Sequence, residues 1–85
     1  MKRGDLVILR DSLAGGVNLY NDFYMSNYSP GTHHDPRVWR SGVMFNPEDV
    51  GIVLDESILS FSLYNKILVP GGVGWIFSHW MEVVG

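Results

Sequence analysis

The sequence predicts an all-β domain, a small and strongly bent β-barrel of about five core strands. Its apolar residues occur in short runs rich in Val, Ile and Leu, and each run is bounded by Gly, Pro, Asn or Asp. The 85 residues include ten glycines, and the apolar residues do not recur at the spacing of an amphipathic helix, so no such helix is predicted. A chain of this length is predicted to form one domain, residues 1–85.

Two core strands flank a long intervening segment. The first, in residues 2–10, contains the run Leu6-Val7-Ile8-Leu9 and is predicted to be buried on both faces. The second is VGIVL at residues 50–54. It follows the tetrapeptide NPED, where Asn at the first position and Pro at the second favour a type I turn.

The last third of the chain predicts three more strands. Residues 61–69 and 73–77 form a hairpin across a PGG turn, and residues 81–84 re-enter the sheet after a tight SHW corner. Gly72 and Gly74 are expected to let the hairpin twist and to let another backbone or ring approach closely.

The two-residue alternation places Phe61, Leu63, Ile67 and Val69 on one face of the first hairpin strand. Asn65 falls in the same register. Because a buried amide without partners is costly, we expect a β-bulge at Asn65 or a local departure of this face from the core.

The corner and the final hairpin strand carry polar and aromatic residues with expected structural roles. Trp75 is expected to be largely buried by the hairpin, and Trp80 to pack over the open end of the barrel. Ser78 is expected to cap the corner, because its hydroxyl can accept a hydrogen bond from a backbone amide.

Residues 11–46 are predicted to be a long irregular insertion between the first two core strands. Val38-Trp39 and Val43-Met44-Phe45 could form short strands around Ser41-Gly42. The aromatic residues of the insertion can cap the barrel, form a contact surface for another protein, or line a small-molecule cleft; they are Tyr20, Phe23, Tyr24, Tyr28, Trp39 and Phe45. We expect Phe45 and some of Tyr20, Phe23 and Tyr24 to pack on the barrel. The tip, from residue 28 to residue 39, should stay on the surface.

Four segments together resemble an SH3-like barrel: GDLV (4–7), VGIVL (50–54), the VPGG turn (69–72) and the closing W…WMEVV (75–84). More narrowly, they resemble small single-domain SH3-like proteins encoded by tailed bacteriophages, including cyanophages. The resemblance covers roughly residues 1–10 and 50–85 and implies a fold rather than an activity. A looser similarity is to the SH3-like docking subunits of photosynthetic electron-transfer complexes, which are typically more basic than this chain.

The residue types argue against catalysis, so the chain is predicted not to be an enzyme and to need no cofactor. With no cysteine, thiol catalysis and thiolate metal sites are excluded. His33, His34 and Asp35 form the most enzyme-like string, and we interpret it as a solvated loop with metal binding as the alternative. Ser78-His79 is not a triad, because sequence adjacency does not supply the orienting third group.

The predicted function is therefore a non-enzymatic protein-interaction or assembly module, in a virion or bound to a host protein. Trp39 lies between Arg37 and Arg40, and Trp and Arg are favoured at interface hot spots. These three residues and Tyr28 are the predicted partner-binding site. The partner is expected to be a virion protein, a host protein or a second copy of the chain.

Nucleic-acid binding is the alternative function, because residues 37–40 (RVWR) could stack a base and hold phosphates. A net charge of −3 and six scattered basic residues make it the less favoured one. The longest N-terminal apolar stretch, Leu6 to Leu9, is too short for a signal peptide or a spanning helix, so no membrane role is predicted. The expected location is the virion or host cytoplasm if the chain is phage-encoded, and otherwise the cytoplasm.

Overall fold

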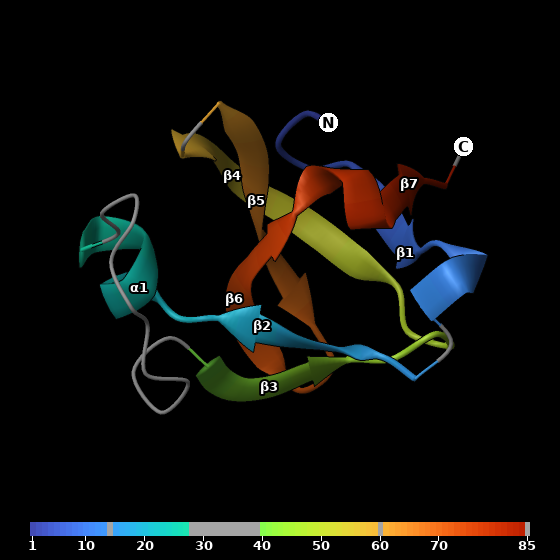
Figure 1. The fold of residues 1–85 in the computed structure, drawn as a ribbon. Helices are drawn as coiled ribbons and strands as arrows, with labels where there is room; N and C mark the ends of the chain where they lie inside the picture. The colour runs from blue at the N-terminus through green and yellow to red at the C-terminus, as the bar shows by residue number, and fades with distance from the viewer. Residues whose placement is uncertain (14, 28–39, 60, 85) are drawn as a thin grey trace.

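The computed structural model describes residues 1–13, 15–27, 40–59 and 61–84. These residues form one antiparallel sheet of seven strands in the order β3-β2-β6-β5-β4-β1-β7. The strands are β1 (Leu6–Leu9), β2 (Val17–Tyr20), β3 (Arg40–Phe45), β4 (Gly51–Leu59), β5 (Ser62–Val69), β6 (Gly72–Phe77) and β7 (Met81–Val83). They are joined by the 3₁₀ turns η1 (Asp11–Leu13) and η2 (Ser78–Trp80) and by the helix α1 (Asp22–Asn27) (Figure 1).

The all-β prediction is confirmed, and the prediction of a five-stranded barrel is wrong in closure and in strand number. The pairs β2–β3 and β1–β7 lie at opposite ends of the bent sheet (Figure 1). The edge strands β3 and β7 do not pair with each other, so within the described residues the sheet remains open. An open sheet keeps two edges whose backbone groups face away from the other strands.

The two additional strands come from the segment that was predicted to be irregular. Val17 pairs with Phe45 and Asn18 with Met44, so β2 and β3 form an antiparallel pair from two segments of the predicted insertion. The expected break at Ser41-Gly42 is a bulge inside β3, because the next pair after Asn18–Met44 is Tyr20–Arg40. The prediction missed β2 because its four residues, which follow two glycines, are too few to show a clear alternation of apolar and polar side chains.

The helix α1 is the second element that the sequence did not predict. The side chain of Asn21 accepts a hydrogen bond from the Tyr24 amide at 2.7 Å, which is the bond that an N-cap asparagine makes. A helix of six residues is too short to show apolar periodicity, so only the cap marks it in the sequence.

The core lies on the concave face of the bent sheet, and every strand contributes to it. Phe45 packs here as expected and is completely buried. The buried side chains are Val7, Leu9, Leu19, Phe45, Val53, Ile67, Val69, Ile76 and Met81. Trp80 is half-buried and packs against this cluster from η2.

A β-bulge was predicted at Asn65 in β5, and the structure has one in the neighbouring strand β4 instead. Val53 pairs with Ile67 and Asp55 with Lys66, so Leu54 is the additional residue. Asn65 itself stays in the core at 0% exposure. Its amide donates to the Asp55 carbonyl at 3.3 Å, and its carbonyl accepts a hydrogen bond from the Ser78 hydroxyl. Both halves of the amide are therefore satisfied, and the face does not leave the core.

The Ser78 bond also corrects the capping prediction. The N-cap of η2 is Phe77, and no side-chain cap bond forms there. The Ser78 hydroxyl points instead into the core, because the buried Asn65 carbonyl needs a donor.

Two burial predictions are wrong, one for the first strand and one for Phe61. Leu6 is 45% exposed, so β1 is buried on one face only and not on both. Phe61 precedes β5 and is fully exposed, so it does not share the buried face of Ile67 and Val69. Trp75 is 8% exposed as expected, but it lies on the face opposite Gly74 and Ile76.

Two turns in the C-terminal half of the chain lie where the sequence predicts them. Val69 pairs with Gly72, so Pro70 and Gly71 form the turn of the predicted hairpin. Residues 46–49 form the other predicted turn, which is closed by the Asp49 amide on the Asn46 carbonyl at 3.0 Å. Gly74 is the close-approach position, because an added Cβ would lie 2.5 Å from Leu19 Cβ.

We therefore expect Gly74→Ala to lower the free energy of unfolding by about 1–3 kcal/mol through overpacking against β2. Gly71→Ala is the matched control, because the nearest atom to its added Cβ is at 3.6 Å. Chemical denaturation followed by tryptophan fluorescence measures both variants. Equal stability of the two variants would show that β2 does not approach Gly74 as described.

Candidate functional site

Three of the four sequence-predicted site residues lie outside the described part of the chain. They are Tyr28, Arg37 and Trp39, and the string His33-His34-Asp35 lies outside it as well. The side chain of Phe23 is also outside it. Arg40 is described: it begins β3, is exposed, and pairs across the strands with Tyr20.

The described residues were searched for side chains that could together bind a metal ion. No group of three or more acidic or histidine side chains among them could hold a metal ion. His79 is exposed, and its ring lies 5.1 Å from the ring of Phe77. The described chain contains no helix with the length and apolar character needed to cross a membrane.

An aromatic cluster lies on the convex face of the sheet, next to α1. The rings of Tyr20 and Tyr24 stack at 4.7 Å, and Tyr64 meets Tyr20 edge-on at 6.1 Å. Phe77 continues the cluster from Tyr64, at 5.6 Å between centroids. Burial raises the pKa of Tyr20, and the positive charge of Arg40 partly opposes this rise. Two expected packing residues of the insertion, Tyr20 and Tyr24, thus do pack on the sheet.

Asp22 fixes α1 to this cluster. Its carboxylate accepts a hydrogen bond from the Trp75 indole at 2.6 Å and lies 3.5 Å from the Lys66 ammonium. These contacts hold the pKa of Asp22 below its usual value, with the Trp75 bond as the largest cause. Trp75 is therefore buried beneath the first turn of α1, on the convex face.

An apolar row crosses the same convex face over four strands and the residue after β7. Leu6 pairs with Ile52, Ile52 with Leu68, and Leu68 with Val73. Val84 extends the row, because its amide donates to the Leu6 carbonyl at 2.8 Å. Directly paired residues of antiparallel strands project from the same face. Five aliphatic side chains, each 39–46% exposed, thus form one line about 19 Å long at the usual strand spacing.

The tip of the β4–β5 hairpin forms a second exposed apolar feature. Ile58 is 71% exposed and Phe61 is 103% exposed. This end of the hairpin projects away from the remainder of the sheet (Figure 1). Phe61 is also the described non-glycine residue with a positive φ, at 64°.

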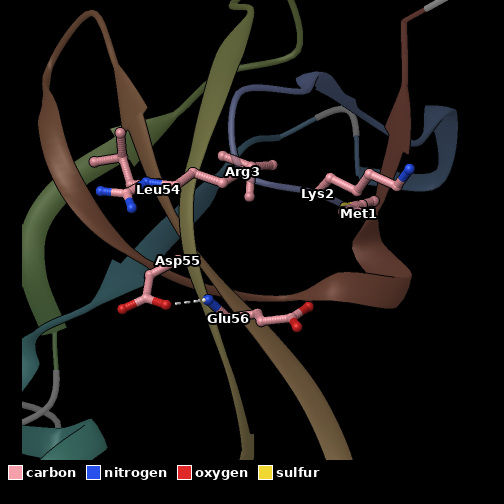
Figure 2. A pocket seen from close by; sticks show the side chains of 7 residues that line it. Met1, Lys2, Arg3, Leu54, Asp55 and Glu56 are labelled. Atoms are coloured by element: carbon pink, nitrogen blue, oxygen red, sulfur yellow. Dashed lines mark hydrogen bonds between the residues drawn. The ribbon is translucent and has the colours of Figure 1, made fainter.

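A cleft of about 440 Å³ lies at the base of that hairpin. The N-terminal segment forms one wall and is held on β4 by the Gly4 amide, which donates to the Val53 carbonyl at 2.7 Å. The residues around the cleft are Met1, Lys2, Arg3, Val53, Leu54, Asp55 and Glu56. In Figure 2 the side chains of Lys2 and Arg3 extend in opposite directions. The side chains of Asp55 and Glu56 lie below them in this view.

Sequence reasoning missed the apolar row and the cleft. The signal for the row was the presence of consecutive apolar residues in several strands. The run Leu6 to Leu9 was interpreted as a strand buried on both faces, but a chain of 85 residues is too small to cover both faces of a sheet. The cleft depends on the bulge at Leu54 and on contacts distant in sequence, for which the sequence gives no local signal.

Comparisons with known proteins gave no relative. No family model, no curated protein and no solved structure matches this chain.

The Asp22–Trp75 bond predicts a pH dependence. Because the folded pKa of Asp22 is lowered, its stabilising contribution is present above the unfolded pKa of about 4 and is lost as pH falls through the folded pKa. We expect Asp22→Asn to be less stable than the parent at pH 7, and the difference to be smaller at an acidic pH below about 4. Urea unfolding at both pH values tests this. A difference that is the same at both would assign the effect to something other than the carboxylate charge.

Proposed function

We propose that this chain is a non-enzymatic protein-interaction or assembly module and that the apolar row on the convex face is its binding surface. The row, Val84-Leu6-Ile52-Leu68-Val73, is the observation that supports the proposal most directly. Exposed aliphatic side chains that adjoin across several strands are typical of interaction sites, whereas isolated exposed ones are ordinary. Burial of such a row would supply the hydrophobic contribution to binding.

The surroundings of the row suit a protein partner. The aromatic cluster and the pair Asp22–Lys66 border it on the same face, so an apolar strip adjoins polar and aromatic side chains. Protein interfaces have this arrangement of an apolar centre with a polar rim. The sequence resemblance supports the narrower proposal that the protein is SH3-like, is encoded by a tailed phage, and acts in the virion or on a host protein.

A charge placed in the row tests the surface. We expect Leu68→Lys to abolish capture of the partner, because a lysine in the centre of an apolar contact must be desolvated. The free energy of unfolding should change by less than about 1 kcal/mol, since Leu68 is 41% exposed. Affinity capture from the source cells or virions, with quantitative mass spectrometry, measures binding.

Val83→Lys is the matched control for Leu68→Lys. Val83 is 49% exposed but pairs with Val7, so it faces the opposite side of the sheet. A protein that is captured by the parent and by Val83→Lys, but not by Leu68→Lys, supports the proposal. Capture that is indifferent to Leu68→Lys, or the absence of any specific capture, contradicts it. Titration with single-stranded DNA and RNA at low salt separates this function from nucleic-acid binding, because electrostatic attraction is strongest there.

A separate experiment tests the partner-binding residues that were predicted from the sequence. If the tip around Tyr28, Arg37 and Trp39 contributes to binding, Trp39→Ala should weaken capture while changing stability by less than about 1 kcal/mol. Trp75→Ala is the comparison, and we expect it to cost about 3–5 kcal/mol because Trp75 is buried under α1. Equal destabilisation by the two substitutions would show that Trp39 has a structural role.

A further inference from the structure

The tip of the β4–β5 hairpin has the form of an apolar knob. Phe61 is fully exposed, and Ile58 beside it exposes 71% of its surface. Ile58 pairs with Leu63, so the apolar surface extends from the tip onto both strands. The closest charged residues along β4 are Asp55 and Glu56, and residues 55–65 contain no Lys or Arg.

The backbone at Phe61 adds a second observation. Its φ of 64° lies in the left-handed region, where Gly, Asn and Asp are ordinary and a bulky residue is an outlier. No contact of the ring compensates for this conformation within the folded chain, since the side chain is fully exposed. Strained residues of this kind cluster at functional sites.

The cleft at the base of the same hairpin is complementary to the knob. Met1 and Leu54 supply its apolar side chains. A volume of about 440 Å³ exceeds the roughly 150 Å³ cavity that holds a benzene ring, so a phenyl group fits. Lys2 and Arg3 border it, which suits a knob whose own neighbours are carboxylates.

Within the part of the chain that the structure describes, the charges around the cleft form no ion pairs with one another. Among the described residues, no ion pair joins Lys2 or Arg3 to Asp55 or Glu56, although all four line the cleft. The Asp55 carboxylate accepts a hydrogen bond from the Glu56 amide, at 2.8 Å (Figure 2). Because both signs of charge lie at one cleft, a two-fold axis beside it would bring Lys2 and Arg3 of one copy opposite Asp55 and Glu56 of the other.

From these observations we propose that a second copy of this chain occupies the cleft, with Phe61 of each copy inserted into the cleft of the other. The knob and the cleft lie on the same hairpin, and β4 runs four residues or about 13 Å from Asp55 at the cleft to Leu59 at the tip, so one two-fold axis can satisfy both contacts. The inference rests on the proposed function, because self-association is one form of protein interaction. It uses a different surface from the apolar row.

Sedimentation equilibrium of the full chain tests the proposal. The parent should form a concentration-dependent dimer, and Phe61→Asn should be monomeric at the same concentrations. Asn tolerates a positive φ, so the melting temperature of Phe61→Asn, compared at low concentration, should be unchanged or higher. A monomeric parent at millimolar concentration overturns the inference, and so does a Phe61→Asn variant that still dimerises.

Leu68→Lys separates this inference from the proposed function. We expect it to dimerise as the parent does, because Leu68 lies in the apolar row and not in the cleft. If Leu68→Lys abolishes dimerisation and Phe61→Asn does not, self-association uses the apolar row and the inference is wrong while the proposed function stands. Open-ended polymers of the parent would contradict the two-fold arrangement.

Charge reversal gives an independent test. The double variants Lys2→Glu with Arg3→Glu, and Asp55→Lys with Glu56→Lys, should each be monomeric, because each brings like charges together across the axis. Mixed in equal amounts they should form a heterodimer, since one variant is then acidic at all four positions and the other basic. Failure of the mixture to associate, with both variants folded by circular dichroism, overturns the proposed pairing. If the mixed variants bind phosphatidylcholine vesicles but do not associate with each other, the knob is a membrane-binding element. That result would also overturn the proposed dimer.

Discussion

The arrangement of this sheet depends on the buried amide of Asn65. A completely buried amide must satisfy both its donor and its acceptor inside the protein. Here the donor reaches the Asp55 carbonyl beside the bulge in β4, and the acceptor receives the Ser78 hydroxyl from the η2 turn. One side chain thereby connects the bulged strand, the central strand β5 and the turn that leads into β7. Loss of either bond would leave a polar group unpaired in the core, which is more costly than the bond is favourable.

The bulge that this amide holds decides what each side of β4 presents. Ile52 belongs to the convex face and Val53 to the core, and simple alternation would return Ile58 to the convex side. The additional residue Leu54 reverses the alternation, so that Glu56 pairs with Asn65 and Ile58 with Leu63 on the concave side. The apolar row and Ile58 of the apolar knob therefore lie on opposite sides of one hairpin. The cleft lies beside this bulge, where Gly4 and Asp5 of the N-terminal segment are hydrogen-bonded to Val53.

The sequence predicts the half of the fold whose signals are local. The hairpin around Pro70 and Gly71, the turn at residues 46–49 and the re-entry of the last strand all depend on residues close together in the chain. It does not predict β2, because Val17 to Tyr20 becomes a strand only by pairing with β3 and β6. The bulge was expected at Asn65 and lies across from it at Leu54, because the polar residue is visible in the sequence and its partner is not. Of the predicted site, Arg40 alone can be placed, and the apolar row becomes visible only when four strands are brought into register.

Both exposed apolar features have the same physical origin, which is the small size of the chain. A single bent sheet from a chain this small can bury only one of its two faces fully. On the convex face, the described element that covers part of the sheet is α1, which lies over Trp75. Leu6, Ile52, Leu68 and Val73 stay partly exposed beside that short helix, and Phe61 is fully exposed at the tip of the hairpin. Solvated polar residues at these positions would remove the exposed apolar surface without affecting the core. Their aliphatic and aromatic character is accounted for if other protein surfaces cover them, as the proposals above require.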